Sequence, residues 1–136
     1  MPPEAAAQRP IPVPDEASAP FFEGAARGEL MLQRCGSCGA FMWPVKPRCV
    51  ECFSGEVRWE PASGRACLYS FVVVHQRYPG FEESYVVATV ETPEGVRFNT
   101  SVVGAAPGEL KIGMPLEVVF EPVSADVVVP KFRRAA

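Results

Sequence analysis

The spacing of apolar residues divides the chain into one short helical segment followed by strands. Apolar side chains recur at helical spacing in "PFFEGAARGEL", namely at Phe21, Phe22, Ala25 and Ala26. Gly28 is placed to end this helix, and "ELMLQR" after it predicts a short strand. Because so short a helix is marginal by itself, we expect tertiary or partner contacts to hold it.

From Glu56 onward the pattern is that of β-strands. Five segments are rich in β-branched and aromatic residues: "RACLYSFVVVHQRY", "SYVVATVE", "VRFNTSVVG", "PLEVVFEPV" and "DVVVPKFRR". The "TPEG" between the second and third predicts a hairpin. In the first of these five segments, strict alternation would place Leu68, Val72 and Val74 on one face of the strand. The opposite face would carry Cys67, Tyr69, Phe71, Val73 and His75. Five strands with no substantial helix among them favour a mainly β fold with a five-stranded OB-type barrel.

The composition of the first residues indicates an N-terminal arm, and the remaining chain divides into modules. Six of the fifteen prolines fall in the first twenty residues, which contain almost no large apolar side chain. Such a segment buries too little surface to offset its ordering cost, so residues 1–19 are predicted to be a flexible proline-rich arm. The expected modules are then 20–33 (short helix and lead-in strand), 34–60 (cysteine-bearing ribbon) and 61–136 (OB-fold barrel).

Four of the five cysteines form two Cys-x-x-Cys pairs, Cys35 with Cys38 and Cys49 with Cys52. Two intervening residues let both sulfurs of a pair reach one ion, and four thiolates suit tetrahedral Zn²⁺. Four protein ligands leave no open position for water, which indicates a structural zinc ribbon of rubredoxin-like form rather than a catalytic zinc. A redox centre or an iron–sulfur cluster is the alternative.

Charge and targeting signals restrict the remaining classes of function. The net charge is −3 and the pI near 5.2, whereas nucleic-acid-binding domains are commonly basic. The N-terminus lacks the basic and apolar regions of a secretory signal, and no apolar run approaches the length of a membrane span. We therefore expect a cytoplasmic protein, in which reduced cysteines are available to bind metal.

The chain offers little for catalysis. His75 is the single histidine, and Cys67 stands alone in a predicted strand. No nucleophile elbow, P-loop or dinucleotide fingerprint is present. The aromatic residues of the ribbon and of the first barrel loop exceed what turns require, and they suit core packing or an interface: Phe41 and Trp43, with Tyr78, Phe81 and Tyr85.

The order of these modules resembles that of the acyl-CoA-associated family of zinc-ribbon/OB-fold proteins. The similarity extends from about Pro20 to Arg133 and is most specific in the cysteine pairs, the "PGF" loop, "GVRF" and "IGMP". The fifth cysteine and the long arm are not part of that pattern. The resemblance implies a non-catalytic accessory subunit of thiolase-superfamily enzymes: thiolases, hydroxymethylglutaryl-CoA synthase assemblies, or aldolases acting on steroid side-chain CoA thioesters in lipid metabolism.

The same resemblance implies partners and a shared ligand. The partner would be a thiolase-type enzyme in a hetero-oligomer, of heterotetramer type, in some cases with an enoyl-CoA hydratase. The catalytic residues would come from the partner, and a CoA thioester would be enclosed between the two chains. The residues predicted to contact ligand or partner are Phe41, Trp43, His75, Arg77, Tyr78, Phe81, Arg97, Asn99, Lys131 and Arg133; Arg and Lys suit the phosphates of CoA.

Two other functions remain open at this point. A zinc ribbon with an OB barrel also occurs in single-stranded nucleic-acid-binding modules, whose affinity falls steeply with salt. A free-standing enzyme would have to use His75 or Cys67.

Overall fold

A computed structural model describes residues 11–43, 45–76 and 84–135 of the 136-residue chain. The helix α2 spans Ala19–Ala26, with Pro20 in its first turn, where the missing N–H has no intrahelical partner to lose. Gly28 follows the helix with φ +83°, the left-handed conformation that ends helices. The predicted short helix and its stop are confirmed.

The cysteine-bearing ribbon is a three-stranded antiparallel sheet. Its central strand β1 (Met31–Cys35) pairs with β2 (Phe41–Met42) on one side and β3 (Val57–Pro61) on the other. The predicted lead-in strand is therefore the middle of the ribbon. Cys35 ends β1, and the other three paired cysteines lie in the loops beyond these strands.

The remaining strands form one six-stranded sheet in the order β6-β5-β4-β8-β9-β7. The strands are β4 (Arg65–Val74), β5 (Tyr85–Glu91), β6 (Arg97–Thr100), β7 (Val102–Val103), β8 (Pro115–Pro122) and β9 (Val128–Arg134). A 3₁₀ turn spans Pro107–Glu109. All pairs are antiparallel except β7 with β9. The OB-type mainly β fold is confirmed.

The strand count differs from the predicted five because the third segment is divided at Ser101. Its first half, β6, pairs with β5, and its second half, β7, pairs in parallel with β9. The carbonyl of Ser101 accepts a hydrogen bond of 3.0 Å from the Phe132 N–H at this switch. No ladder joins β6 to β7 in the described chain, so the sheet is not closed by hydrogen bonds.

The alternation predicted for β4 is wrong because the strand carries a bulge. Leu68 pairs with Val90, but the next pair is Ser70 with Thr89, which leaves Tyr69 as the extra residue. The bulge shifts the pleat by one position. Leu68 therefore shares the inner face with Phe71 and Val73 rather than opposing them, while Tyr69 is exposed.

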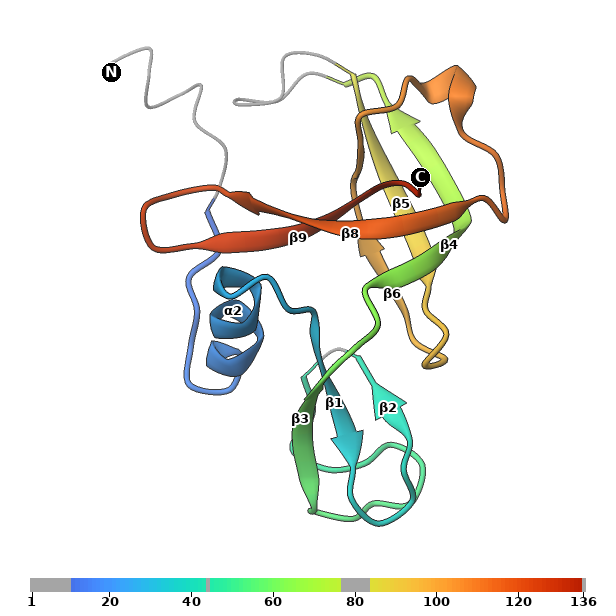
Figure 1. The fold of residues 1–136 in the computed structure, drawn as a ribbon. Helices are drawn as coiled ribbons and strands as arrows, with labels where there is room; N and C mark the ends of the chain where they lie inside the picture. Colours follow the sequence, from blue (N-terminus) through green and yellow to red (C-terminus); the bar gives the residue numbers. More distant parts are fainter. Residues whose placement is uncertain (1–10, 44, 77–83, 136) are drawn as a thin grey trace.

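One hydrophobic core extends from the ribbon into the OB sheet. Leu30 and Leu32, around the start of β1, belong to the same buried cluster as Leu68, Leu116 and Phe132 of the OB sheet. In Figure 1 the ribbon lies at one end of the molecule and α2 lies beside it, and the helix contacts both β1 and β9. The ribbon and the OB sheet therefore cannot be separated without opening this core. None of the helices in the described ranges is long and apolar enough to cross a membrane.

Candidate functional site

The four paired cysteines converge as the sequence predicts. Their Sγ atoms all lie within 4.8 Å of one another. Cys35 Sγ is 3.6 Å from Cys52 Sγ, and Cys38 Sγ is 3.5 Å from Cys49 Sγ. A tetrahedron with Zn–S bonds of about 2.3 Å has sulfurs about 3.8 Å apart. The geometry and the soft donor set thus fit one Zn²⁺ ion.

Backbone N–H groups of each cysteine turn point at the first sulfur of the pair. The N–H groups of Cys38 and Ser37 donate to Cys35 Sγ at 3.4 and 3.3 Å and lower the pKa of that thiol to about 6. At the other turn, the N–H groups of Cys52 and Glu51 donate to Cys49 Sγ and lower the pKa of Cys49. These bonds favour the thiolate, which is the form that binds zinc.

The metal centre is built to support structure. Cys35 and Cys49 are buried, and Met42 packs against them in a small cluster beneath the site. Four sulfurs complete the coordination of zinc and leave no position for a substrate or a reactive water. Zinc bound here would hold both ends of the loop between the two pairs, near Gly39 and near Arg48.

That loop presents Trp43 to the helix and to the OB sheet. The Trp43 ring lies 5.0 Å from the ring of Phe21 on α2 and 5.3 Å from that of Phe98 on β6. Phe98 continues the stack to Phe132 on β9 at 5.8 Å. We call the four rings of Phe21, Trp43, Phe98 and Phe132 the aromatic junction, because they join all three modules.

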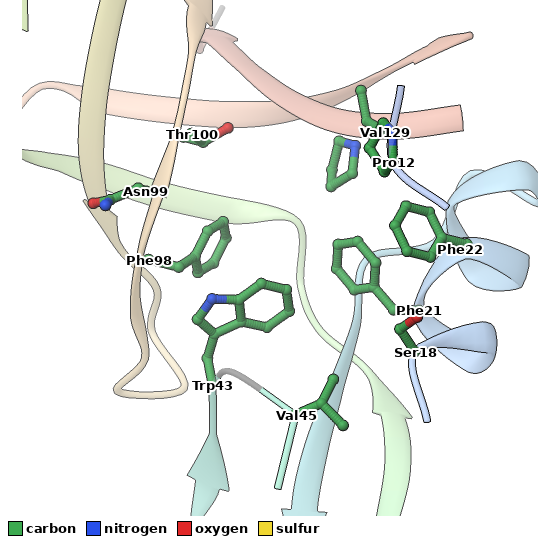
Figure 2. Close-up of a pocket in the computed structure, with 11 residues that line it drawn as sticks. Pro12, Ser18, Phe21, Phe22, Trp43, Val45, Phe98, Asn99, Thr100 and Val129 are labelled. Atoms are coloured by element: carbon green, nitrogen blue, oxygen red, sulfur yellow. The ribbon is translucent and has the colours of Figure 1, made fainter. Parts of the chain in front are cut away.

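An apolar cavity of about 360 Å³ borders the aromatic junction. Figure 2 shows the rings of Phe21, Trp43 and Phe98 gathered around it. Aliphatic side chains and prolines complete most of the wall, and the polar lining is limited to Ser18, Asn99 and Thr100. Its volume is within the range of small-molecule pockets, which run from about 300 to 1,000 Å³.

The predicted contact residues do not form a single cluster. Trp43 and Asn99 line the cavity. Phe41 lies outside it on β2, with the guanidinium of Arg34 4.9 Å from its ring centre. His75 lies beyond the end of β4, and Arg77, Tyr78 and Phe81 fall outside the described residues.

Each basic candidate that the structure describes already has a carboxylate partner. Arg97 pairs with Glu91 at 2.7 Å and lies 4.0 Å above the ring of Tyr69. Lys131 pairs with Glu121 at 3.0 Å and Arg133 with Glu117 at 2.7 Å. Cross-strand pairing explains these partners, since each pair joins neighbouring strands. A phosphate at any of them would compete with a carboxylate for the positive charge.

The candidate catalytic residues are not assembled either. His75 Nδ1 lies 2.9 Å from Ser84 Oγ, a contact that sequence reasoning missed, and both residues are exposed. In the described ranges, no carboxylate orients the His75 ring. Cys67 lies eight residues from His75, roughly 25 Å away along an extended strand at about 3.3 Å per residue. The two therefore cannot act as a nucleophile and base pair.

Comparison with known proteins gives the same two modules. Residues 22–58 match the domain described as "ChsH2, rubredoxin-like zinc ribbon domain", and residues 59–121 match "ChsH2, C-terminal OB-fold domain". A "DUF35 domain-containing scaffold protein" of Methanocaldococcus jannaschii is 33% identical over 96 residues, which cover 68% of each chain. The chain belongs to the DUF35 family.

Other relatives are named as subunits of enzymes or as part of an aldolase. A "Probable enoyl-CoA hydratase alpha subunit" of Thermomonospora curvata is 38% identical over 95% of this chain, which spans 41% of that protein. A "Benzoylsuccinyl-CoA thiolase subunit BbsA" of Geobacter metallireducens is 29% identical over 64% of this chain and 53% of its own length. A solved chain of the "Ltp2-ChsH2(DUF35) aldolase" superposes with a TM-score of 0.84 at 36% identity, over 93% of this chain and all of that one.

Proposed function

We propose that this DUF35 chain is a scaffold subunit that binds a thiolase-superfamily enzyme of thiolase or aldolase type and helps to enclose an acyl-CoA thioester. The observation that carries the proposal is the match to the whole DUF35 chain of the Ltp2-ChsH2 aldolase, at a TM-score of 0.84. The names of the hydratase and thiolase relatives point to the same class of CoA thioester chemistry. The complex is proposed to form in the cytoplasm.

The distribution of reactive groups supports an accessory role. The metal centre has no open coordination position once four sulfurs bind. The His75–Ser84 pair is exposed and lacks an orienting carboxylate among the described residues, and Cys67 is remote from it. We therefore assign the catalytic residues to the partner enzyme.

The aromatic junction supports the proposed enclosure. Its cavity is apolar and is of the size that takes a small apolar group. We assign this cavity to the apolar part of the acyl chain. The phosphates of CoA we assign mainly to the partner, because Arg97, Lys131 and Arg133 are each neutralised by a carboxylate.

Co-expression tests the proposed complex. The chain would be produced together with a thiolase-type protein of the same organism, and the pair analysed by size-exclusion chromatography with light scattering. We expect one peak that contains both chains in fixed proportion. Two separate peaks, together with unaltered activity of the partner, would contradict the proposal.

A further inference from the structure

The two cysteine turns have equivalent backbones but different residues at one position. Gly39 follows Cys38 with φ +79°, and its N–H donates to the carbonyl of Cys35 at 2.9 Å. Phe53 follows Cys52 with φ +62°, and its N–H donates to the carbonyl of Cys49 at 3.0 Å. Phe53 is the one non-glycine residue of positive φ in the described ranges.

Phenylalanine is unfavourable at this position for two independent reasons. A left-handed backbone is strained for a residue with a Cβ atom and is readily adopted by glycine, which occupies the first turn. Phe53 is also 73% exposed, so little burial offsets the strain. Val50 in the same turn is 53% exposed. Backbone strain combined with an exposed apolar side chain is typical of a residue kept for contact with another molecule.

Hydrogen bonds hold the backbone of the turn at Phe53. The N–H of Cys49 donates to the carbonyl of Ser54 at 2.9 Å, and Arg48 Nη1 donates to the carbonyl of Phe53 at 3.1 Å. Zinc bound by Cys49 and Cys52 would fix both ends of the turn. With the backbone held, only the two side-chain torsions of Phe53 remain to be ordered on binding, a small entropy cost for an aromatic contact residue.

The shape and charge of the turn indicate what it contacts. Phe53 and Val50 project from a convex turn, whereas small metabolites bind in concave sites. The exposed Glu51 and Glu56 on either side of Phe53 outnumber the exposed Arg48 and disfavour an anionic lipid surface. A second copy of this chain could receive Phe53 in its apolar cavity, but such a head-to-tail contact would tend to extend into open chains rather than close.

We propose that Phe53, with Val50 beside it, is the anchor by which the zinc ribbon docks into an apolar pocket on its protein partner. This inference rests on the proposed function, in which the partner is the thiolase-type enzyme. It assigns the second cysteine turn, rather than the aromatic junction, to the protein interface.

Two substitutions distinguish the effect of the Phe53 ring from the effect of its strained backbone. In Phe53→Gly the strain is removed, and in Phe53→Asn a residue tolerant of the left-handed conformation replaces the ring. We expect both variants to bind one equivalent of zinc and to unfold at a temperature no lower than the wild type. Their affinity for the co-expressed thiolase-type protein, measured by isothermal titration calorimetry, should fall by about tenfold or more, as for an aromatic anchor. Ile112→Ala, which trims an exposed apolar residue of the OB domain, serves as the control with unchanged affinity.

The outcomes distinguish this inference from the function on which it rests. If the wild type binds the partner and both Phe53 variants bind it as tightly as the wild type does, the assignment of Phe53 as the anchor is wrong and the proposed function stands. If the wild type forms no complex with the thiolase-type protein, both are wrong. Loss of zinc in the variants would also overturn this assignment, because Phe53 would then stabilise the turn itself. Self-association of the chain alone that depends on Phe53 would overturn it too, because Phe53 would then contact a second copy of the chain.

Discussion

The indole ring of Trp43 lies 5.3 Å from the ring of Phe98. Trp43 belongs to the loop between the cysteine pairs and Phe98 to the OB sheet, so this contact connects the metal centre to the second module. Phe21 packs on the same indole at 5.0 Å and adds the helix. The stability of the ribbon, the helix and the OB sheet is therefore expected to be coupled.

The first prediction concerns this contact. Trp43→Ala removes the central ring of the aromatic junction and leaves a cavity that the fixed loop cannot fill. We expect the free energy of unfolding to fall by an amount near the lower end of the about 3–5 kcal/mol found for buried aromatic residues, because Trp43 is only partly buried. Urea unfolding followed by circular dichroism measures the change. The control Ile112→Ala should stay within about 0.5 kcal/mol of the wild type, and an equally small effect for Trp43→Ala would contradict the coupling.

The metal centre gives a second prediction. Cys49→Ser removes a buried ligand, so zinc content should fall well below one equivalent by inductively coupled plasma mass spectrometry. Cys67→Ser is the matched control, since Cys67 lies outside the cluster and should leave one equivalent bound. Full zinc retention in Cys49→Ser would contradict the site.

Removal of the metal should affect more than the ribbon, which is a third prediction. Leu30 and Leu32 share one core with Leu68 and Phe132, so a ribbon that unfolds on chelation exposes part of the OB core. We expect thermal unfolding of the chelated protein at a lower temperature, with tryptophan fluorescence and circular dichroism changing together. An OB sheet that keeps its original unfolding temperature without metal would show that the modules are independent.

A fourth prediction tests how α2 approaches β1. A Cβ atom on Gly24 would overlap the Met31 side chain and lie 3.1 Å from the carbonyl oxygen of Glu29. Gly24→Ala should therefore lower the free energy of unfolding by about 1 kcal/mol. The steric cost of overpacking, about 1–3 kcal/mol, exceeds the stabilisation gained by replacing glycine with alanine in a helix. Gly108→Ala, where a Cβ would meet nothing within 4 Å, is the control. Equal unfolding midpoints in urea would contradict this close approach.

Features encoded locally could be predicted from the sequence. The cysteine pairs predicted the metal site because two-residue spacing fixes both sulfurs within one turn. The "TPEG" segment predicted its hairpin, in which the Gly95 N–H donates to the Thr92 carbonyl at 2.9 Å. The helix, its stop at Gly28 and the segments that form strands followed from apolar periodicity in the same way.

Features that depend on pairing with distant segments could not be predicted. The bulge at Tyr69 arises from the register between β4 and β5, and alternation alone gives no sign of it. The division at Ser101 reflects two different neighbours of one apolar segment. The carboxylates that neutralise Lys131 and Arg133 face them across the β8–β9 ladder, so these side chains are less available to phosphates than their charge alone indicates.

The charge pairing also bears on the nucleic-acid alternative, which yields a fifth prediction. With a net charge of −3 and with Arg97, Lys131 and Arg133 each ion-paired, the chain lacks a free basic groove at those positions. A labelled oligothymidylate should show no retention in a filter-binding assay at low salt. Saturable binding that weakens steeply as salt rises would instead support a nucleic-acid-binding module.

We propose that this chain assists a thiolase-type enzyme and does not react by itself. The most direct measurement titrates the chain into its thiolase-type partner and follows turnover of an acyl-CoA thioester. We expect turnover to rise and to saturate at a fixed ratio of the two chains, while the chain alone gives none. Turnover by the isolated chain, or a partner whose rate is unchanged at every ratio, would contradict it.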